Sequence, residues 1–230
     1  MPTDVLTRQY PGGGTLVEAY CRTLLVNDFG DYWDPPAQSI VEKTGRKVLL
    51  DLLTHCSERP EDFTNNGDIV NYLNLFSWYC QRRAFITTEA GYIGLAPTAT
   101  RPGDIVAALL GCASPLVLRP ADTHPCVYQV VGECYLNSFM SGEAFLGPLP
   151  KNYKSVLKFN EERTHYKPAF RDILSCQITF EDPRYKLLLG RVYQERVECE
   201  GSADKRDRNR ALVMEVLRVR GMELTWFNIV

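Results

Sequence analysis

The chain has 230 residues, a formal net charge of −2, and 45% hydrophobic and 23% charged side chains, which is ordinary globular composition. This composition argues against a disordered chain, and the balanced charge excludes a globally basic nucleic-acid binder. The charge is uneven along the sequence: residues 1–83 and 84–150 each carry −3, and residues 151–230 carry +4. Few charged side chains fall in the middle segment, so we expect much of it to be buried or covered.

The first segment has helical periodicity. Thr15 and Glu18 fit a capping box, and the apolar spacing that follows predicts a helix ending near Gly30. Further helices are predicted over about 39–56 and 68–82. We therefore expect a helical layer over residues 1–83.

The middle segment has short β-branched and apolar runs separated by Gly- and Pro-rich turns. Residues 101–104 read Arg-Pro-Gly-Asp, with Pro and Gly where a type II turn needs them, and Gly132 is a predicted bend or bulge. The predicted strands are 85–88, 92–95, 105–110, 116–119 and 128–136. Strands this short favour a small barrel over an open sheet.

The last segment is mixed. Residues 211–220 have helical spacing and end at Gly221. The other expectations are a covering loop over 148–168, strands over 173–180, 187–197 and 222–226, and a solvated charged loop over 201–210. The predicted fold class is α+β, with the N-terminal helices packed on a small SH3-like or Greek-key β-barrel. The barrel is expected over residues 84–147, with 148–230 as a mixed extension packing on the same core as one compact unit.

The cysteine pattern and the N-terminal sequence indicate the cellular compartment in which the protein is expected. The chain has eight cysteines, no Cys-x-x-Cys pair and no apolar leader after Met1, so we expect reduced thiols, mostly buried. The longest uncharged apolar stretch, residues 105–118, is too short to span a membrane. The sequence thus predicts a soluble, cytoplasmic protein that binds neither nucleic acid nor membrane.

Most isolated signals for chemistry are weak. Gly12 to Thr15 precede a helix start and offer an anion site or simply an entry turn. His124 lies two residues from Cys126, which gives a nucleophile pair if they touch or otherwise a polar loop. The basic residues Lys205, Arg206, Arg208 and Arg210 are interspersed with Asp204 and Asp207, as on a solvated surface. The three histidines lack metal-ligand spacing, and we predict no metal, no cofactor and no catalytic residue.

Two glutamates of the charge-poor segment are the more interesting polar residues. Glu133 and Glu143 could form an acid–base pair if one were buried. Alternatively, Glu133 lies buried and forms a structural ion pair with Arg119 or Arg101, closing the barrel. The candidate ligand- or partner-binding residues are Arg101, Asp104, Arg119, Glu133 and Glu143.

A set of motifs in the middle of the chain resembles the C-terminal region of fungal heterokaryon-incompatibility (HET) proteins. The resemblance is most specific over residues 82–143. The motifs are Arg82 to Thr87, Gly91 to Pro97, Arg101 to Asp104, Pro115 to Arg119, Tyr128, Val131 to Tyr135 and Met140 to Glu143. Looser similarity covers residues 18–24, 181–184 and 221–230.

Two departures qualify the resemblance. The family often has His-Gly where this chain has Asn137-Ser138, so a role tied to that pair does not transfer. The death-inducing HET domain that precedes this region in the family is expected to be absent, because its signature has no counterpart here.

The resemblance implies a non-enzymatic accessory, regulatory or protein-binding module in fungal self/non-self recognition. One alternative is an enzyme or small-ligand sensor with a polar site at the barrel mouth. Another is a truncated gene product without a separate function. The oligomeric state is left open.

Overall fold

The computed structural model describes residues 7–27, 33–34, 47, 67–121, 126–160, 162, 164–190, 193–194 and 205–230. Helices and strands are mixed along the chain, which confirms the α+β class. The helices are α2 (Leu16–Leu24), α5 (Gly67–Cys80), α6 (Glu143–Leu146), α7 (Pro183–Leu189) and α9 (Lys205–Val219). The strands are β1 (Trp33–Asp34), β2 (Arg83–Thr87), β3 (Ile93–Pro97), β4 (Ile105–Ala107), β5 (Leu116–Pro120), β6 (Val127–Glu133), β7 (Tyr135–Leu136), β8 (Tyr153–Phe159), β9 (Tyr166–Asp172), β10 (Ile178–Thr179) and β11 (Asn228–Ile229).

The chain divides into two compact units. The first contains residues 1–140 and 227–230, and the second contains residues 141–226. The sequence-based boundaries, and the expectation that residues 148–230 pack on the same core as the barrel, stay predictions.

The predicted capping box begins α2. Thr15 Oγ1 accepts the Glu18 amide at 3.3 Å, and Glu18 Oε2 accepts the Thr15 amide at 2.9 Å. The helix stops at Leu24 rather than near Gly30, because the backbone of Val26 and Asn27 is left-handed. Gly30 itself lies outside the described residues.

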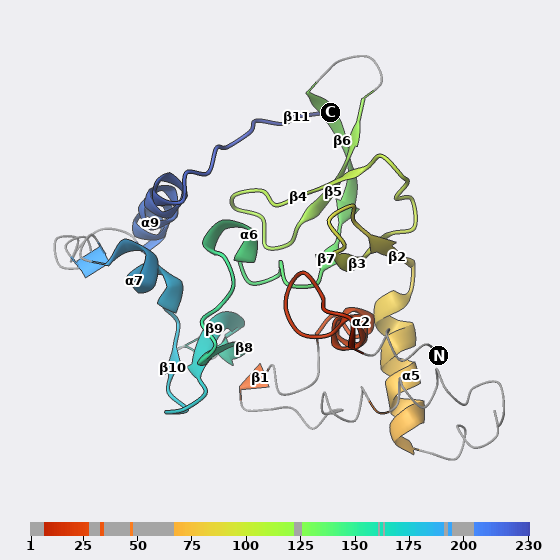
Figure 1. Ribbon diagram of the computed structural model, residues 1–230, viewed down its shortest axis with the longest axis horizontal. Coiled ribbons are helices and arrows are strands. Elements are labelled where there is room, and N and C mark those ends of the chain that lie inside the picture. Colours follow the sequence, from red (N-terminus) through yellow and green to blue (C-terminus); the bar gives the residue numbers. More distant parts are fainter. Residues whose placement is uncertain are drawn as a thin grey trace. The chain divides into compact units, whose positions relative to one another are not determined.

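The predicted 68–82 helix is confirmed as α5, and it packs beside α2 (Figure 1). It ends two residues early, and Arg82, with φ 56°, turns the chain directly into β2. The buried residues between the two helices are Val17, Cys21, Leu24, Leu25, Ile69 and Tyr72. The helix predicted over 39–56 lies outside the described residues except at Lys47.

The predicted middle strands form two sheets in the first unit. One has the order β2-β3-β7 and the other β11-β6-β5-β4; all pairs are antiparallel except β11 with β6. The register between β5 and β6 shifts at Val117, opposite Gly132, so the predicted bulge is confirmed. Ala96, Val117 and Cys134 form a buried core to which both sheets contribute. The described strands do not join into a closed barrel.

In the second unit, the described residues include a small sheet and the helices α6, α7 and α9. Strands β8, β9 and β10 pair antiparallel in that order. Helices α6, α7 and α9 meet around a separate core. Its buried residues are Leu146, Leu189, Tyr193, Leu212 and Val216.

Several predictions for this last segment are wrong. The loop expected over 148–168 contains β8 and the start of β9; in β8 only Val156 is buried, so the alternation typical of a half-buried strand is missing. Residues 187–189 of the expected strand 187–197 belong to helix α7 instead, since Asp182 caps this helix and Pro183 occupies its first turn, and residues 191–192 and 195–197 lie outside the described residues.

The charged run and the two remaining strands also differ from expectation. Residues 205–210 belong to helix α9 rather than to a loop, since Lys and Arg are good helix formers. Only residues 178–179 of the 173–180 segment pair as a strand, because residues 173–176 make a turn. Residues 222–226 are not strand, and pairing begins two residues later in β11.

The close approach of β3 and β7 gives a first prediction. A Cβ added at Gly94 would lie 2.3 Å from the Tyr135 carbonyl oxygen, so Gly94→Ala must push the strands apart. We expect a loss of about 2 kcal/mol in the free energy of unfolding, measured with urea. The matched control is Gly67→Ala, where no atom lies within 4 Å, and it should be neutral or slightly stabilising. Equal stability of Gly94→Ala and the wild type would contradict this strand packing.

Candidate functional site

Three of the five predicted site residues meet at one turn of the first unit. Residues 101–104 form the expected type II turn: the Asp104 amide donates to the Arg101 carbonyl at 3.1 Å, and Gly103 has φ +92°. Asp104 Oδ2 also accepts the Arg101 amide at 2.8 Å. Arg119, from β5, reaches the same carboxylate with Nε at 2.8 Å and Nη2 at 2.9 Å. The turn and the strand are thereby fastened together.

Both oxygens of the Asp104 carboxylate accept hydrogen bonds from arginine residues. Its side chain is only 4% exposed, and the hydrogen bond from Arg119 is the main reason its pKa lies below the ordinary value. The same hydrogen bond, which Arg119 donates to Asp104, raises the pKa of Arg119. Arg119 Nη2 also donates to the Ala99 carbonyl at 2.7 Å. This arrangement keeps Asp104 charged and occupied, which suits a structural clasp better than an acid–base role.

Glu133 has a different partner from the one expected. The sequence suggested a buried glutamate paired with Arg119 or Arg101, but Glu133 is 66% exposed and its carboxylate accepts Arg83 Nη2 at 2.9 Å. Arg83 Nη1 also donates to the Glu133 carbonyl at 2.6 Å. The expectation was wrong because Asp104 already occupies Arg119. The pair joins β2 of one sheet to β6 of the other.

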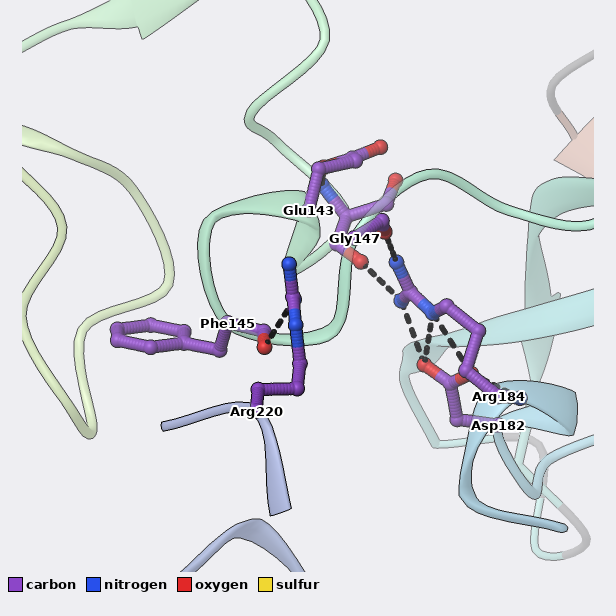
Figure 2. Close-up of polar contacts among 7 residues, drawn as sticks. Glu143, Phe145, Gly147, Asp182, Arg184 and Arg220 are labelled. Carbon is purple, nitrogen blue, oxygen red and sulfur yellow. Dashed lines mark hydrogen bonds and ion pairs between the residues drawn. The ribbon is translucent and has the colours of Figure 1, made fainter. Parts of the chain in front are cut away.

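Glu143 belongs to the second unit and Glu133 to the first, so the acid–base pair of the two glutamates stays a hypothesis. Its Oε2 accepts the Ser141 amide at 2.7 Å, at the start of α6. Arg220 donates from Nη1 to the Phe145 carbonyl at 2.6 Å, near the end of the same short helix. Figure 2 shows both residues around this turn.

The most completely buried charge of the second unit was not singled out by sequence. Arg184, 2% exposed, donates to both carboxylate oxygens of Asp182 and to the Gly147 and Ser141 carbonyls at 2.6 and 2.5 Å (Figure 2). A planar guanidinium satisfies all these acceptors at once, which an ammonium cannot do. The Asp-Pro start of α7 was a usable helix signal, but nothing in the sequence indicated that the next arginine turns inward.

A second buried network joins the N-terminal segment to β3 and β7. Tyr10 Oη donates to the Asn137 carbonyl at 3.0 Å and accepts the Ile93 amide at 3.2 Å. Asn137 Nδ2 donates to the Ala19 carbonyl of α2 at 3.2 Å. Tyr10 and Asn137 are 4% and 6% exposed, and burial is the main cause that raises the pKa of Tyr10. We call these four residues the Tyr10 junction.

The junction gives physical meaning to the departure at positions 137–138. Ser138 has φ +71°, a backbone conformation that favours glycine, and its hydroxyl donates to the Gly12 carbonyl at 3.3 Å. A Cβ at Gly12 would lie 2.2 Å from that hydroxyl oxygen. Asn137 provides the N–H donor that holds α2. The pair therefore serves the fold at this position.

Thiols and histidines bring no further site together among the described residues. Cys21 and Cys134 are buried, and burial raises the pKa of Cys134 to about 11. The expectation of mostly buried thiols was wrong for Cys112, Cys126 and Cys176, which are exposed and free. His124 and His55 lie outside the described residues. No group of described His, Cys, Asp or Glu residues has a metal-binding arrangement, and no described helix could span a membrane.

Large apolar side chains are exposed on three contacting elements of the first unit. Helix α5 buries Ile69 and Tyr72 on one side, and its exposed side carries Val70, Leu73 and Trp78 among polar residues. Tyr20 of α2 and Phe85 of β2 lie with ring centroids 4.8 Å apart, both partly exposed. We define the aromatic surface as Tyr20, Val70, Leu73, Trp78 and Phe85.

Comparison with known proteins gave one match. A family model described as the Het-6 beta-barrel domain matches residues 17–148, more than half of the chain. The match runs from α2 to just past α6 and contains residues 82–143, which confirms the resemblance seen in the sequence. No curated protein and no solved structure is significantly similar to the chain.

The Asp104 clasp gives a prediction with a pH signature. Asp104→Asn should lower the free energy of unfolding at pH 7 by about 1 kcal/mol, because it removes the charged acceptor of Arg119. The folded-state pKa is depressed, so this contribution is present above about pH 4, the unfolded pKa, and is lost as pH falls through the folded value. Urea titrations at pH 7, 5, 3 and 2 should therefore show the gap to wild type closing below about pH 4.

The matched control for this experiment is Glu133→Gln. Its exposed ion pair with Arg83 should contribute about 0.5 kcal/mol or less at pH 7. A gap for Asp104→Asn that stayed constant down to pH 2 would show that the carboxylate charge does not matter.

Proposed function

The chain belongs to the family of fungal heterokaryon-incompatibility proteins that carry the Het-6 β-barrel domain, and on this premise we propose that it is a non-enzymatic accessory module that binds a protein partner. Its role in the incompatibility response is regulatory, through that partner. The partner is neither a nucleic acid nor a membrane. The proposed setting is the cytoplasm, where the exposed thiols of Cys112, Cys126 and Cys176 stay reduced.

The observation that carries the proposal is the aromatic surface. Trp78 is 74% exposed, and it lies on the same helix as two further exposed apolar residues, Val70 and Leu73. Exposed aromatic side chains held on a rigid scaffold are the usual anchors of protein interfaces.

The polar groups support binding over chemistry. Asp104 and Arg119 are engaged with each other, and Glu133 with Arg83. Each group thus has its charge partner within the first unit, where it fastens strands. In a protein-binding module, charged residues that only stabilise the fold in this way are sufficient, because no chemical step requires them. The SH3-like or Greek-key type of barrel is part of the proposal, and the core shared by the two sheets supports it.

The proposal predicts the behaviour of a surface variant in a fungal strain that carries this gene. Replacing the gene with the Trp78→Ser, Phe85→Ser double variant should weaken the incompatibility reaction to the level of a deletion, because the partner loses its anchors. The reaction is scored in confrontation cultures, with the protein level followed by immunoblot. The wild-type chain expressed alone should leave viability at the level of the empty vector.

The matched control is Leu187→Ser, which removes an apolar side chain that is 67% exposed on α7, outside the family match. It should leave the reaction intact. Cell death caused by the chain alone would contradict an accessory role, and so would a stable double variant with a full reaction or a deletion that behaves as the wild type.

A further inference from the structure

The last strand of the chain extends the sheet of the first unit at its edge. In Figure 1, β11 lies beside the start of β6. The pairing is parallel, with Asn228 opposite Val127 and Ile229 opposite Tyr128. The Asn228 amide donates to the Cys126 carbonyl at 3.2 Å, and the Val230 amide donates to the Tyr128 carbonyl at 3.0 Å.

Side chains contribute little to this pairing. Phe227 meets the ring of Tyr128 edge-on, with centroids 5.1 Å apart. The apolar neighbours stay in solvent: Trp226 is 89% exposed, Val230 79% and Ile229 49%. A short strand held by main-chain hydrogen bonds and one ring contact opens at low free-energy cost.

The edge beneath β11 is longer than β11 itself. Strand β6 has seven residues and pairs with β5 on one side, while β11 covers two residues on the other. Beyond this pairing, Gln129 and Val130 are exposed. A partly covered sheet edge offers backbone donors and acceptors to any extended segment that reaches it.

We propose that this edge of β6 is a binding site for an extended segment of the partner protein, and that β11 occupies the site until that segment displaces it. The occupant seen in the structure defines the chemistry: an aromatic residue at the position of Phe227 and a β-branched residue two positions later, running parallel to β6. Because Gln129 and Val130 of β6 are exposed directly beyond β11, an incoming strand can pair with more residues than β11 does. This inference rests on the proposed partner-binding function and names where and how the partner binds.

The test uses the full chain and a fluorescent peptide with the sequence of residues 222–230. Asn228→Pro removes the amide that donates to Cys126 and should free the edge, whereas the matched Asn228→Ala keeps that amide. Fluorescence anisotropy should show the peptide binding Asn228→Pro at least fivefold more tightly than it binds Asn228→Ala, because the site is no longer occupied in cis. The same peptide with proline at the asparagine position should not bind.

A second variant guards against misfolding of Asn228→Pro. Phe227→Ala keeps every backbone bond and removes the ring contact with Tyr128, so it should also raise peptide affinity, though less. Equal peptide affinity for the proline and alanine variants, or no binding to any variant, would overturn the proposal. A wild-type dimer in light scattering that becomes a monomer in Asn228→Pro would instead assign the edge to a second copy and also overturn it. The peptide assay tests only the binding site at the edge of β6, whereas the fungal experiment tests the partner-binding function. Either experiment can therefore fail while the other succeeds.

Discussion

The Tyr10 junction is the constraint on which the first unit depends. One buried hydroxyl bridges the ends of β3 and β7, and the Asn137 amide beside it holds a carbonyl of α2. Buried groups of this kind are costly to leave unpaired, so removing one of them releases the others. The aromatic surface is built on α2, α5 and β2, and α2 contacts β3 directly. The proposed interface therefore exists only while the junction keeps α2 on the sheet.

Ion pairs of charged side chains also connect separate elements of the fold. The Asp104–Arg119 pair fastens a turn to β5, and the Arg83–Glu133 pair joins the two sheets beside their shared core. In the second unit, Arg184 gathers Asp182 and two carbonyls near α6. In each place an arginine donates to at least one backbone carbonyl as well as to a carboxylate, so these three arginines stabilise the scaffold.

The sequence allowed correct prediction of those structural features that depend on a few neighbouring residues. The Thr15–Glu18 box, the 101–104 turn and the bulge at Gly132 each follow from residue types at fixed spacing, and each is confirmed. Pairing between distant residues was beyond such patterns: Glu133 was assigned to Arg119 or Arg101, whereas its partner, Arg83, lies 50 residues away in the chain. The inward turn of Arg184 and the network of Asn137 depend on acceptors supplied by other elements. The strand β8 was missed for a related reason, since its narrow buried face left no alternating signal.

Hydrogen exchange in a Tyr10→Phe variant tests the central claim, that the junction makes the helices and the sheet of the first unit one module. The phenylalanine keeps the ring and removes only the hydroxyl that bridges Asn137 and Ile93. The account predicts that amides throughout α2 and β3 lose protection together by similar factors. Faster exchange confined to the Ile93 amide, with α2 as protected as in the wild type, would contradict it.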